Sequence, residues 1–377
     1  YKFTMQHAVI KLFPKAKVRY GFINRGKHIF PAGFADLLRS SVDAMSDLRL
    51  TKEEKSYLAH YCPYLDPTYL DFLQGYSFDP SEVHITQEGS EIKVTVEGFW
   101  YRTILWEVPL MALISELFYK SNHLIRLNDE AIKDLTKEKI DNYNKLGVSV
   151  LEFGTRRRHS YDVHDLINET LKTYGGQSFI GTSNVHFAMV NNRRPLGTHA
   201  HEWFMFHAAQ YGFKMANSIS LEHWTQVYGG DLGIALTDTY TTEIFFNQFD
   251  KKYSKLFDGV RHDSGDPIEF AQKVISHYVK MGIDPKSKAI VFSDSLNYDK
   301  VKKIVDFCQD KIKTSFGIGT NFTNDVGLPA MNMVIKLTDT KPDNIHWQGV
   351  VKLSDEKNKN TGTPEMITLA KQVLGIK

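Results

Sequence analysis

The apolar and polar positions in the first third of the chain follow both helical and strand-like periods. Apolar residues recur with a helical period at 34–50, "FADLLRSSVDAMSDLRL". Two segments of alternating character follow, "EVHITQEG" at 82–89 and "EIKVTVEGFW" at 91–100, and they meet at a Gly-Ser turn signal. The mixture predicts an α+β domain over residues 1–120.

Two further helices are predicted before the pattern changes. The apolar segment 102–121 contains Pro109, which indicates a kink or a break between two helices. The charge-rich segment 129–147 reads as a solvated helix that ends at its glycine.

Beyond this point, short apolar or β-branched runs alternate with helical segments. Seven such runs are candidate strands, at 148–154, 178–184, 194–200, 232–238, 258–266, 288–294 and 313–320. Repeated βα units favour a parallel sheet, and polar residues gather at the carboxyl ends of the runs, where a closed α/β barrel keeps its active site. An open doubly wound sheet would favour a glycine fingerprint after its first strand, and none is present. We therefore expect an α/β protein with an irregular (β/α) barrel at 121–339, and residues 340–377 rejoining the N-terminal domain.

Composition narrows the functional classes. The chain has 377 residues, a net charge of +2 and only two cysteines, Cys62 and Cys308. A dense basic face for duplex nucleic acid is therefore not expected, and neither is a disulfide framework. No apolar run approaches the ~20 residues of a membrane span. A small anionic ligand and a cytoplasmic location are the expectations.

Two segments at predicted strand ends suit anions. Three consecutive arginines occupy 156–158 directly after a strand, and guanidinium groups bind phosphate or carboxylate bidentately. Gly317, Gly319 and Thr320 follow the last predicted strand and precede a short helix, a common phosphate site in barrels. Together they point to a phosphorylated ligand.

A third segment, "DGVRHDSGDP", combines basic and acidic groups. Asp266 before Pro267 is typical of a helix N-cap. We assign Arg261 and Asp263 to the ligand, because acidic groups bind ribose hydroxyls or magnesium and arginine binds an anion.

Three histidines lie within nine positions of "RPLGTHAHEWFMFHAAQ". His199 and His201, with Asp263, could form the metal centre of a barrel hydrolase. Alternatively, one imidazole is reactive, oriented by Glu202, while the others, including His207, are structural. A regulatory module that binds a phosphorylated metabolite is the non-enzymatic alternative.

Eight motifs in order carry a resemblance that covers the whole chain. They are "YKFTMQHAV", "LEFGTRRRHS", "FIGTSNV", "PLGTHAHEW", "GIALTDTYTTE", "GVRHDSGDP", "VFSDSLN" and "SFGIGTNFTND". Together they resemble the bacterial nicotinate phosphoribosyltransferases, of the type II phosphoribosyltransferase family. In that family an acidic residue usually precedes the Tyr-Lys pair, so we expect residues before Tyr1 in the complete protein.

The resemblance implies roles for the pyridine pocket. Phe153 and Tyr1 look like two aromatic plates around the ring, with the tyrosine arriving from a partner subunit. Ser183, beside Thr182, stands where related nicotinamide-using enzymes have an aspartate, whose charge would repel nicotinate. Thr182 and Ser183 are therefore assigned to substrate binding.

The resemblance also implies roles around the ribose. Arg156 and Arg261 would serve the carboxylate and phosphates, Asp263 the ribose, and the glycines and threonine of 317–320 the 5-phosphate. His201 matches the family's phosphorylated histidine.

The implied reaction joins nicotinate to 5-phosphoribosyl-1-pyrophosphate. Nicotinate mononucleotide and pyrophosphate are the products, ATP hydrolysis is coupled, magnesium is required, and the enzyme is a homodimer with shared active sites. No resident protein-bound metal is assigned.

Overall fold

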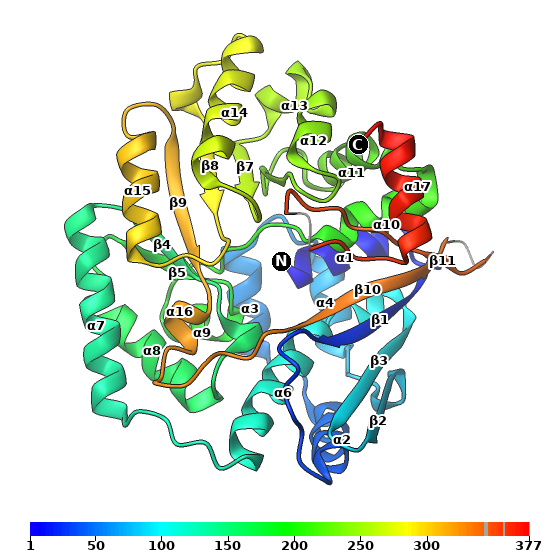
Figure 1. Ribbon diagram of the computed structural model, residues 1–377, viewed down its shortest axis with the longest axis vertical. Coiled ribbons are helices and arrows are strands. Elements are labelled where there is room, and N and C mark those ends of the chain that lie inside the picture. The colour runs from blue at the N-terminus through cyan, green and yellow to red at the C-terminus, as the bar shows by residue number, and fades with distance from the viewer. Residues whose placement is uncertain (343–345, 357–358, 377) are drawn as a thin grey trace.

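An antiparallel sheet and a parallel sheet form the two halves of the molecule (Figure 1). The structure is a computed structural model that describes residues 1–342, 346–356 and 359–376. The antiparallel sheet has the strand order β11-β10-β1-β3-β2. Its strands are β1 (Lys17–Asn24), β2 (Val83–Glu88), β3 (Glu91–Phe99), β10 (Met333–Lys341) and β11 (Gln348–Gly349).

The predicted strand pair and helix break of the N-terminal half are confirmed. β2 and β3 pair as an antiparallel hairpin, and the turn places Gly89 at a φ of 59°. α5 ends at Thr103 and α6 begins at Glu107, with Pro109 in the first turn of α6, where its missing N–H costs nothing. The helices of this half are α1 (Lys2–Leu12), α2 (Phe34–Ala44), α3 (Lys52–Tyr61), α4 (Pro67–Gly75), α5 (Trp100–Thr103) and α6 (Glu107–Ser121).

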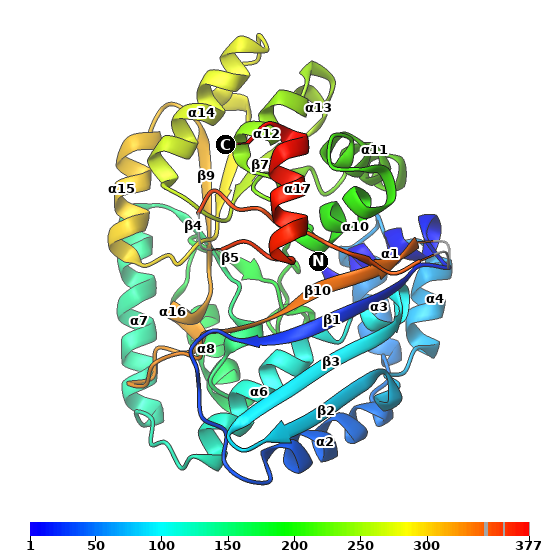
Figure 2. The same cartoon turned by 45° about the vertical axis from the view of Figure 1, so that its right-hand side comes forward.

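The chain returns to the first sheet after it leaves the second. β10 pairs along the whole length of β1, so residues 333–341 lie beside residues 17–24 (Figure 2). The division at residue 339 stays a prediction.

The parallel sheet has the order β5-β4-β9-β8-β7-β6, which is a ring cut between β5 and β6. Its strands are β4 (Ser149–Glu152), β5 (Phe179–Thr182), β6 (Ile234–Leu236), β7 (Gly259–His262), β8 (Ala289–Phe292) and β9 (Lys313–Ile318). Among the described residues six of the seven candidate runs are therefore strands, and the expected irregular barrel is confirmed.

The run 194–200 is the exception, and it corrects the prediction of a strand there. Pro195 makes an isolated bridge to Thr182 of β5, and its ring nitrogen cannot donate to a ladder. On the other side, the Leu236 backbone N–H of β6 donates to His199 Nε2 at 3.0 Å, a side-chain atom. This irregular segment occupies the place between the two edge strands and completes the barrel.

Most of the remaining helices lie around the parallel strands, and α17 lies beside α10 and β10 (Figure 1). They are α7 (Asp129–Leu146), α8 (Tyr161–Tyr174), α9 (Val185–Val190), α10 (His201–Tyr211), α11 (Ala216–Tyr228), α12 (Thr242–Gln248), α13 (Lys251–Leu256), α14 (Pro267–Lys280), α15 (Tyr298–Cys308), α16 (Thr320–Thr323) and α17 (Pro364–Leu374). In the described part of the chain, no helix is both long and apolar enough to cross a bilayer. One continuous apolar core joins both halves.

Candidate active site

A cavity of about 570 Å³ opens at the carboxyl ends of the barrel strands. The helices of the N-terminal half and the segments that follow them supply an apolar wall that includes Leu48, Tyr57, Leu73, Tyr76 and Phe78. Nine of the residues assigned from the sequence line the cavity: Tyr1, Phe153, Arg156, Ser183, His201, Arg261, Asp263, Gly317 and Gly319. Thr182 and Thr320 are not among its lining residues.

One group of the lining residues, which we call the aromatic end, comprises Tyr1, Phe153, Arg156, Arg157 and Ser183. Phe153 follows β4 directly, and its backbone N–H donates to the Ile318 carbonyl of β9 at 2.7 Å. A Cβ at residue 317 would lie 2.4 Å from Phe153 Cδ2, whereas at residue 319 it would meet only the Phe153 carbonyl, at 3.8 Å. Gly317 therefore makes room for the phenyl ring, while Gly319 faces open space.

Tyr1 lies in the cavity of its own chain, which corrects the expectation that it comes from a partner subunit. The physical reason is its place at the start of α1, whose next residue, Lys2, is held by buried carboxylates of the same chain. The Tyr1 hydroxyl is buried and has no hydrogen-bond partner among the described residues. Burial, with Glu107 nearby, raises the pKa of Tyr1 to about 12.

Residues next to the aromatic end are held by Glu152, whose side chain is buried. The Thr182 hydroxyl donates to Glu152 Oε2 at 2.5 Å, and the Ser183 backbone N–H donates to the Glu152 carbonyl at 2.9 Å. His164 Nε2 lies 2.9 Å from the same carboxylate. The Thr182 hydroxyl is therefore used in a hydrogen bond within the fold. Of Thr182 and Ser183, Ser183 is the residue that lines the cavity.

The three consecutive arginines have different environments. Arg156 Nη1 donates to Glu107 Oε1 at 2.9 Å, and Arg158 lies 3.9 Å from Glu116. Arg157 lines the cavity, and its guanidinium has no ion-pair partner within the described residues. Burial, with Arg156 close by, lowers its pKa from the ordinary arginine value. Because no carboxylate of the described residues pairs with it directly, Arg157 is the most available of the three for an anion.

A second group of side chains, the histidine end, comprises His201 and Asp263, which line the cavity, and Asp238 and Lys352, which contact them. His201 is the first residue of α10. Its Nδ1 lies 3.0 Å from Thr239 Oγ1, and its Nε2 lies 3.0 Å from Asp263 Oδ2 and 2.9 Å from Lys352 Nζ. Burial and the Lys352 charge lower the pKa of His201 despite the two aspartates, so the ring is neutral near neutral pH.

Arg261 joins this end to the rest of the barrel. Its three nitrogens donate to Ser293 Oγ at 2.8 Å, Thr198 Oγ1 at 2.9 Å and Asp263 Oδ1 at 2.7 Å. Burial alone would raise the pKa of Asp263, but Arg261 and His201 hold it well below its usual range. Asp263 is therefore a carboxylate in a fixed position.

The other two histidines of the motif are structural. His199 is buried and accepts the Leu236 N–H, and His207 is enclosed between the Trp203 carbonyl and His223. Burial lowers the pKa of each to about 3. The hydrolase centre built on His199, His201 and Asp263 is therefore wrong, because His199 Nε2 is already used by the backbone. In the described chain, the group of potential metal ligands is instead His201, Asp238 and Asp263.

Asp266 has the N-cap role expected of it. Its carboxylate accepts from the backbone N–H groups of Ile268 and Glu269, at the start of α14.

Sequence reasoning missed several cations close to the histidine end. Lys352 comes from the C-terminal segment, Lys336 from β10, and Arg25 follows β1 directly. Burial, together with Lys352 and Arg25, lowers the pKa of Lys336 to about 7. No motif singles these residues out, since they reach the barrel only because β10 returns beside β1.

The chain matches two family models. Residues 1–115 match the nicotinate phosphoribosyltransferase (NAPRTase) N-terminal domain, and residues 148–377 match the nicotinate phosphoribosyltransferase (NAPRTase) family.

Similar proteins and solved structures cover the whole chain. The nicotinate phosphoribosyltransferase of Chromohalobacter salexigens is 61% identical, over 100% of this chain and 96% of that protein. That of Desulforapulum autotrophicum is 49% identical over 99% and 96%. The crystal structure of the nicotinate phosphoribosyltransferase from Porphyromonas gingivalis superimposes with a TM-score of 0.97 at 45% identity, covering 100% and 97%. The structure from Vibrio cholerae gives 0.94 at 32% identity, covering 100% and 92%.

Proposed function

This chain belongs to the nicotinate phosphoribosyltransferase family, and we propose that it transfers the phosphoribosyl group of 5-phosphoribosyl-1-pyrophosphate to nicotinate. The products are nicotinate mononucleotide, a precursor of NAD, and pyrophosphate, and ATP hydrolysis is coupled to the transfer. The observation that carries the proposal is one cavity lined both by aromatic rings and arginines and by His201 and Asp263, which belong to a network of paired charges.

The aromatic end holds nicotinate in this proposal. Tyr1 and Phe153 stack on the two faces of the pyridine ring, a geometry that aromatic rings favour. Arg156 binds the carboxylate, with Arg157 as a further positive charge close by. Ser183 allows nicotinate to bind in preference to nicotinamide, because its side chain places no negative charge next to the nicotinate carboxylate.

The barrel strand ends hold the activated ribose phosphate. Asp263 accepts hydrogen bonds from ribose hydroxyls, and Arg261 binds a phosphate group. The backbone at Gly319 and Thr320 serves the 5-phosphate, supported by the open space at Gly319. Gly317 also leaves space for the Phe153 ring, because a side chain at this position would clash with it.

Magnesium and ATP belong to the histidine end. Carboxylate oxygens are ligands that Mg²⁺ prefers, so Asp238 and Asp263 are the residues that would hold it. When bound, Mg²⁺ neutralises charge on the polyphosphate. The cations Lys352, Lys336 and Arg25 suit the phosphates of ATP and pyrophosphate.

The chemical step needs little acid–base catalysis. The ring nitrogen of nicotinate forms a bond to C1 of the ribose, the C1–oxygen bond to pyrophosphate breaks, and its electron pair leaves with pyrophosphate. Positive charge develops on the ribose as negative charge develops on the leaving group, so the basic side chains stabilise this transition state. The aromatic plates hold the nitrogen in line with C1. A pyridine nitrogen carries no proton to remove, so no general base is required.

His201 accepts the γ-phosphate of ATP in this scheme. A neutral imidazole is a competent nucleophile toward phosphorus, and its low pKa keeps it neutral. A phosphorylated His201 adds negative charge to the cluster and is hydrolysed as products leave, which ties ATP hydrolysis to turnover.

We also propose a homodimer in the cytoplasm. Both cysteines are free and buried thiols, as suits a reducing compartment. Each chain carries Tyr1 in its own cavity, so the dimer does not need to exchange this residue. Sedimentation of the purified protein tests the dimer.

The direct test is a product assay with nicotinate and 5-phosphoribosyl-1-pyrophosphate, with and without ATP. We expect nicotinate mononucleotide in both arms and faster formation with ATP. Tight binding of both substrates without product would instead favour a regulatory module.

A further inference from the structure

Lys2 lies between two buried carboxylates that the catalytic scheme does not use. Its Nζ is 2.6 Å from Glu107 Oε2 and 3.0 Å from Glu202 Oε1. The three side chains are 7%, 8% and 6% exposed, in the order Lys2, Glu107 and Glu202. A buried ion group of this kind is costly to break, because any member left alone is a charge without solvent.

The two carboxylates belong to different parts of the site: Glu107 pairs with a residue of the aromatic end, and Glu202 is adjacent in sequence to His201 of the histidine end. Glu107 begins α6 and also binds Arg156 at the aromatic end, at 2.9 Å. Glu202 follows His201 in the first turn of α10, a helix without a side-chain cap. One ammonium group therefore connects Arg156, through Glu107, with the turn that carries His201.

Further contacts of α1 fix the same turn. The Ala200 backbone N–H, directly before His201, lies 3.3 Å from Met5 Sδ. Lys2 Nζ is also 5.5 Å from the centre of the Tyr1 ring, within the range of a cation–π interaction. Residues of α1 thus contact both the Tyr1 ring and the backbone directly before His201.

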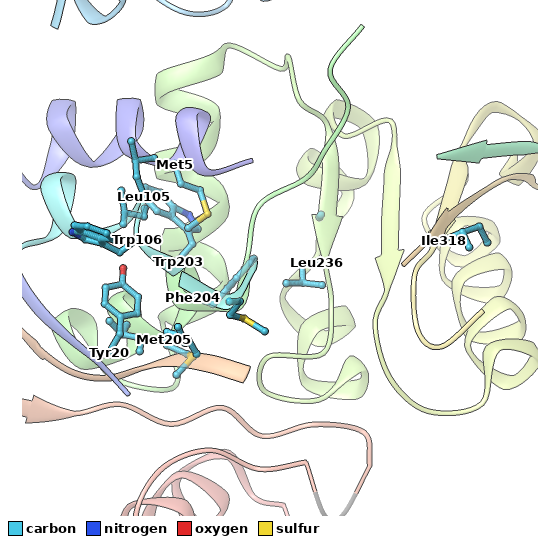
Figure 3. Packing of buried hydrophobic residues seen from close by; sticks show 14 of the residues in the cluster. Met5, Tyr20, Leu105, Trp106, Trp203, Phe204, Met205, Leu236 and Ile318 are labelled. Atoms are coloured by element: carbon cyan, nitrogen blue, oxygen red, sulfur yellow. The ribbon is translucent and has the colours of Figure 1, made fainter. Parts of the chain in front are cut away.

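The surroundings of the ion group are apolar. Trp106 precedes Glu107 and Trp203 follows Glu202, and both indoles are fully buried. Figure 3 shows Met5, Tyr20, Trp106 and Trp203 gathered in one region of the core. Coulomb interactions in such surroundings are weakly screened, so Lys2 attracts both carboxylates strongly and holds each of them in place.

We propose that Lys2 is a positioning residue that ties the two ends of the cavity together, holding Glu107 against Arg156 and Glu202 at the turn that presents His201. The proposal rests on the proposed function, because its readouts are nicotinate use and phosphorylation of His201.

Separate substitutions of the two carboxylates test it. Glu107→Gln should raise the KM for nicotinate about tenfold in the absence of ATP, with little change in kcat, and leave labelling by γ-labelled ATP unchanged. Glu202→Gln should slow the labelling about tenfold and leave that KM unchanged. Lys2→Met should change both readouts.

Glu82→Gln is the matched control. Glu82 is also buried and also pairs with an arginine, accepting from Arg102 Nε at 2.8 Å, and it does not line the cavity. Its substitution should lower the melting temperature without changing either readout.

The outcomes separate this inference from the proposed function. If the unsubstituted protein neither makes nicotinate mononucleotide nor becomes labelled, the proposed function fails. If it does both, an unchanged KM in Glu107→Gln or unchanged labelling in Glu202→Gln overturns the positioning role. Equal losses of both readouts in both variants also overturn it, because they indicate a merely structural role. The single variants keep the test valid even if Lys2→Met does not fold.

Discussion

The aromatic and histidine ends of the cavity differ in how far their charges are already paired. At the histidine end, His201 contacts Asp263 and Lys352 within 3.0 Å, and Lys352 also lies 3.3 Å from Asp238. At the aromatic end, Arg157 has no ion-pair partner and the Tyr1 hydroxyl has no hydrogen bond among the described residues. A ligand that contacts His201 or Asp263 must rearrange an existing network, whereas Arg157 and the Tyr1 hydroxyl are groups without such partners among the described residues.

This contrast suggests that the two ends have different functions. The aromatic end selects a flat ring with one negative charge, because its shape and the unpaired Arg157 decide what binds. The histidine end suits a group that gains and loses charge, because its acids and bases can exchange partners without moving far.

His201→Ala should have the largest effect at the histidine end. Labelling of the protein by γ-labelled ATP and the stimulation of synthesis by ATP should both disappear, while slow synthesis without ATP remains, since the aromatic end is untouched. His207→Ala is the comparison, because its buried ring lies outside the cavity; it should lower thermal stability and keep the labelling. A labelled His201→Ala protein would assign the phosphate to another residue.

Arg261→Met probes the paired network next. Losing a fixed cation that also holds Asp263 should lower kcat/KM about a hundred- to a thousandfold, measured by steady-state kinetics. Arg158→Met is the control, since Arg158 pairs at 3.9 Å with Glu116 and does not line the cavity. Comparable losses in both variants would show that arginine burial, rather than the network, matters.

Ser183→Asp tests selection at the aromatic end. A carboxylate at this position would repel the nicotinate carboxylate, and like charges in a shielded pocket cost several kcal/mol, so the KM for nicotinate should rise by roughly a hundredfold. Ser183→Asn, of similar size and without charge, should raise it much less. If nicotinate kinetics stay the same in the aspartate variant, Ser183 does not determine the choice of acid.

The sequence predicted the aromatic end better than the histidine end, for a physical reason. Phe153, Arg156 and Ser183 sit at strand ends, and strand ends can be read from local patterns. Lys352 lies 151 positions from His201 and reaches it through pairing of the C-terminal segment, which no local pattern reports. The same limitation hid Glu107, whose partners Lys2 and Arg156 come from two other elements.

Errors in the prediction also have specific causes. The run 194–200 has the composition of a strand but contains a proline, and only the neighbouring strands decide that it makes one bridge. The assignment of Gly317 to the 5-phosphate stays a prediction, and the neighbouring Phe153 ring gives a further, steric reason for glycine there. The placement of Tyr1 depended on whether α1 packs on its own chain, which spacing cannot determine.

Lys336 offers a pH test of the histidine end. Its pKa is lowered to about 7 by burial and by the charges of Lys352 and Arg25. Lys336 is therefore charged below this pH and neutral above it, and a bound polyanion favours the charged form. Affinity for pyrophosphate should fall by up to about tenfold per pH unit above 7, with a proton taken up on binding. Titration calorimetry in two buffers measures the uptake. Because pyrophosphate itself titrates, the decisive quantity is the difference from Lys336→Met, and identical uptake in both proteins would exclude Lys336.

Tyr1→Ala should give the smallest effect and the clearest view of the aromatic end. Losing one of two stacked plates should raise the KM for nicotinate about two- to tenfold, since aromatic contacts contribute about 0.5–1.5 kcal/mol. Because Tyr1 lines the cavity of its own chain, a mixture of Tyr1→Ala and Arg261→Ala proteins should show only the sum of their separate activities. If Tyr1 instead served the partner's site, hybrid dimers would contain one intact site and activity would recover. Native mass spectrometry confirms that subunits have exchanged, so that a lack of recovery supports a site completed within one chain.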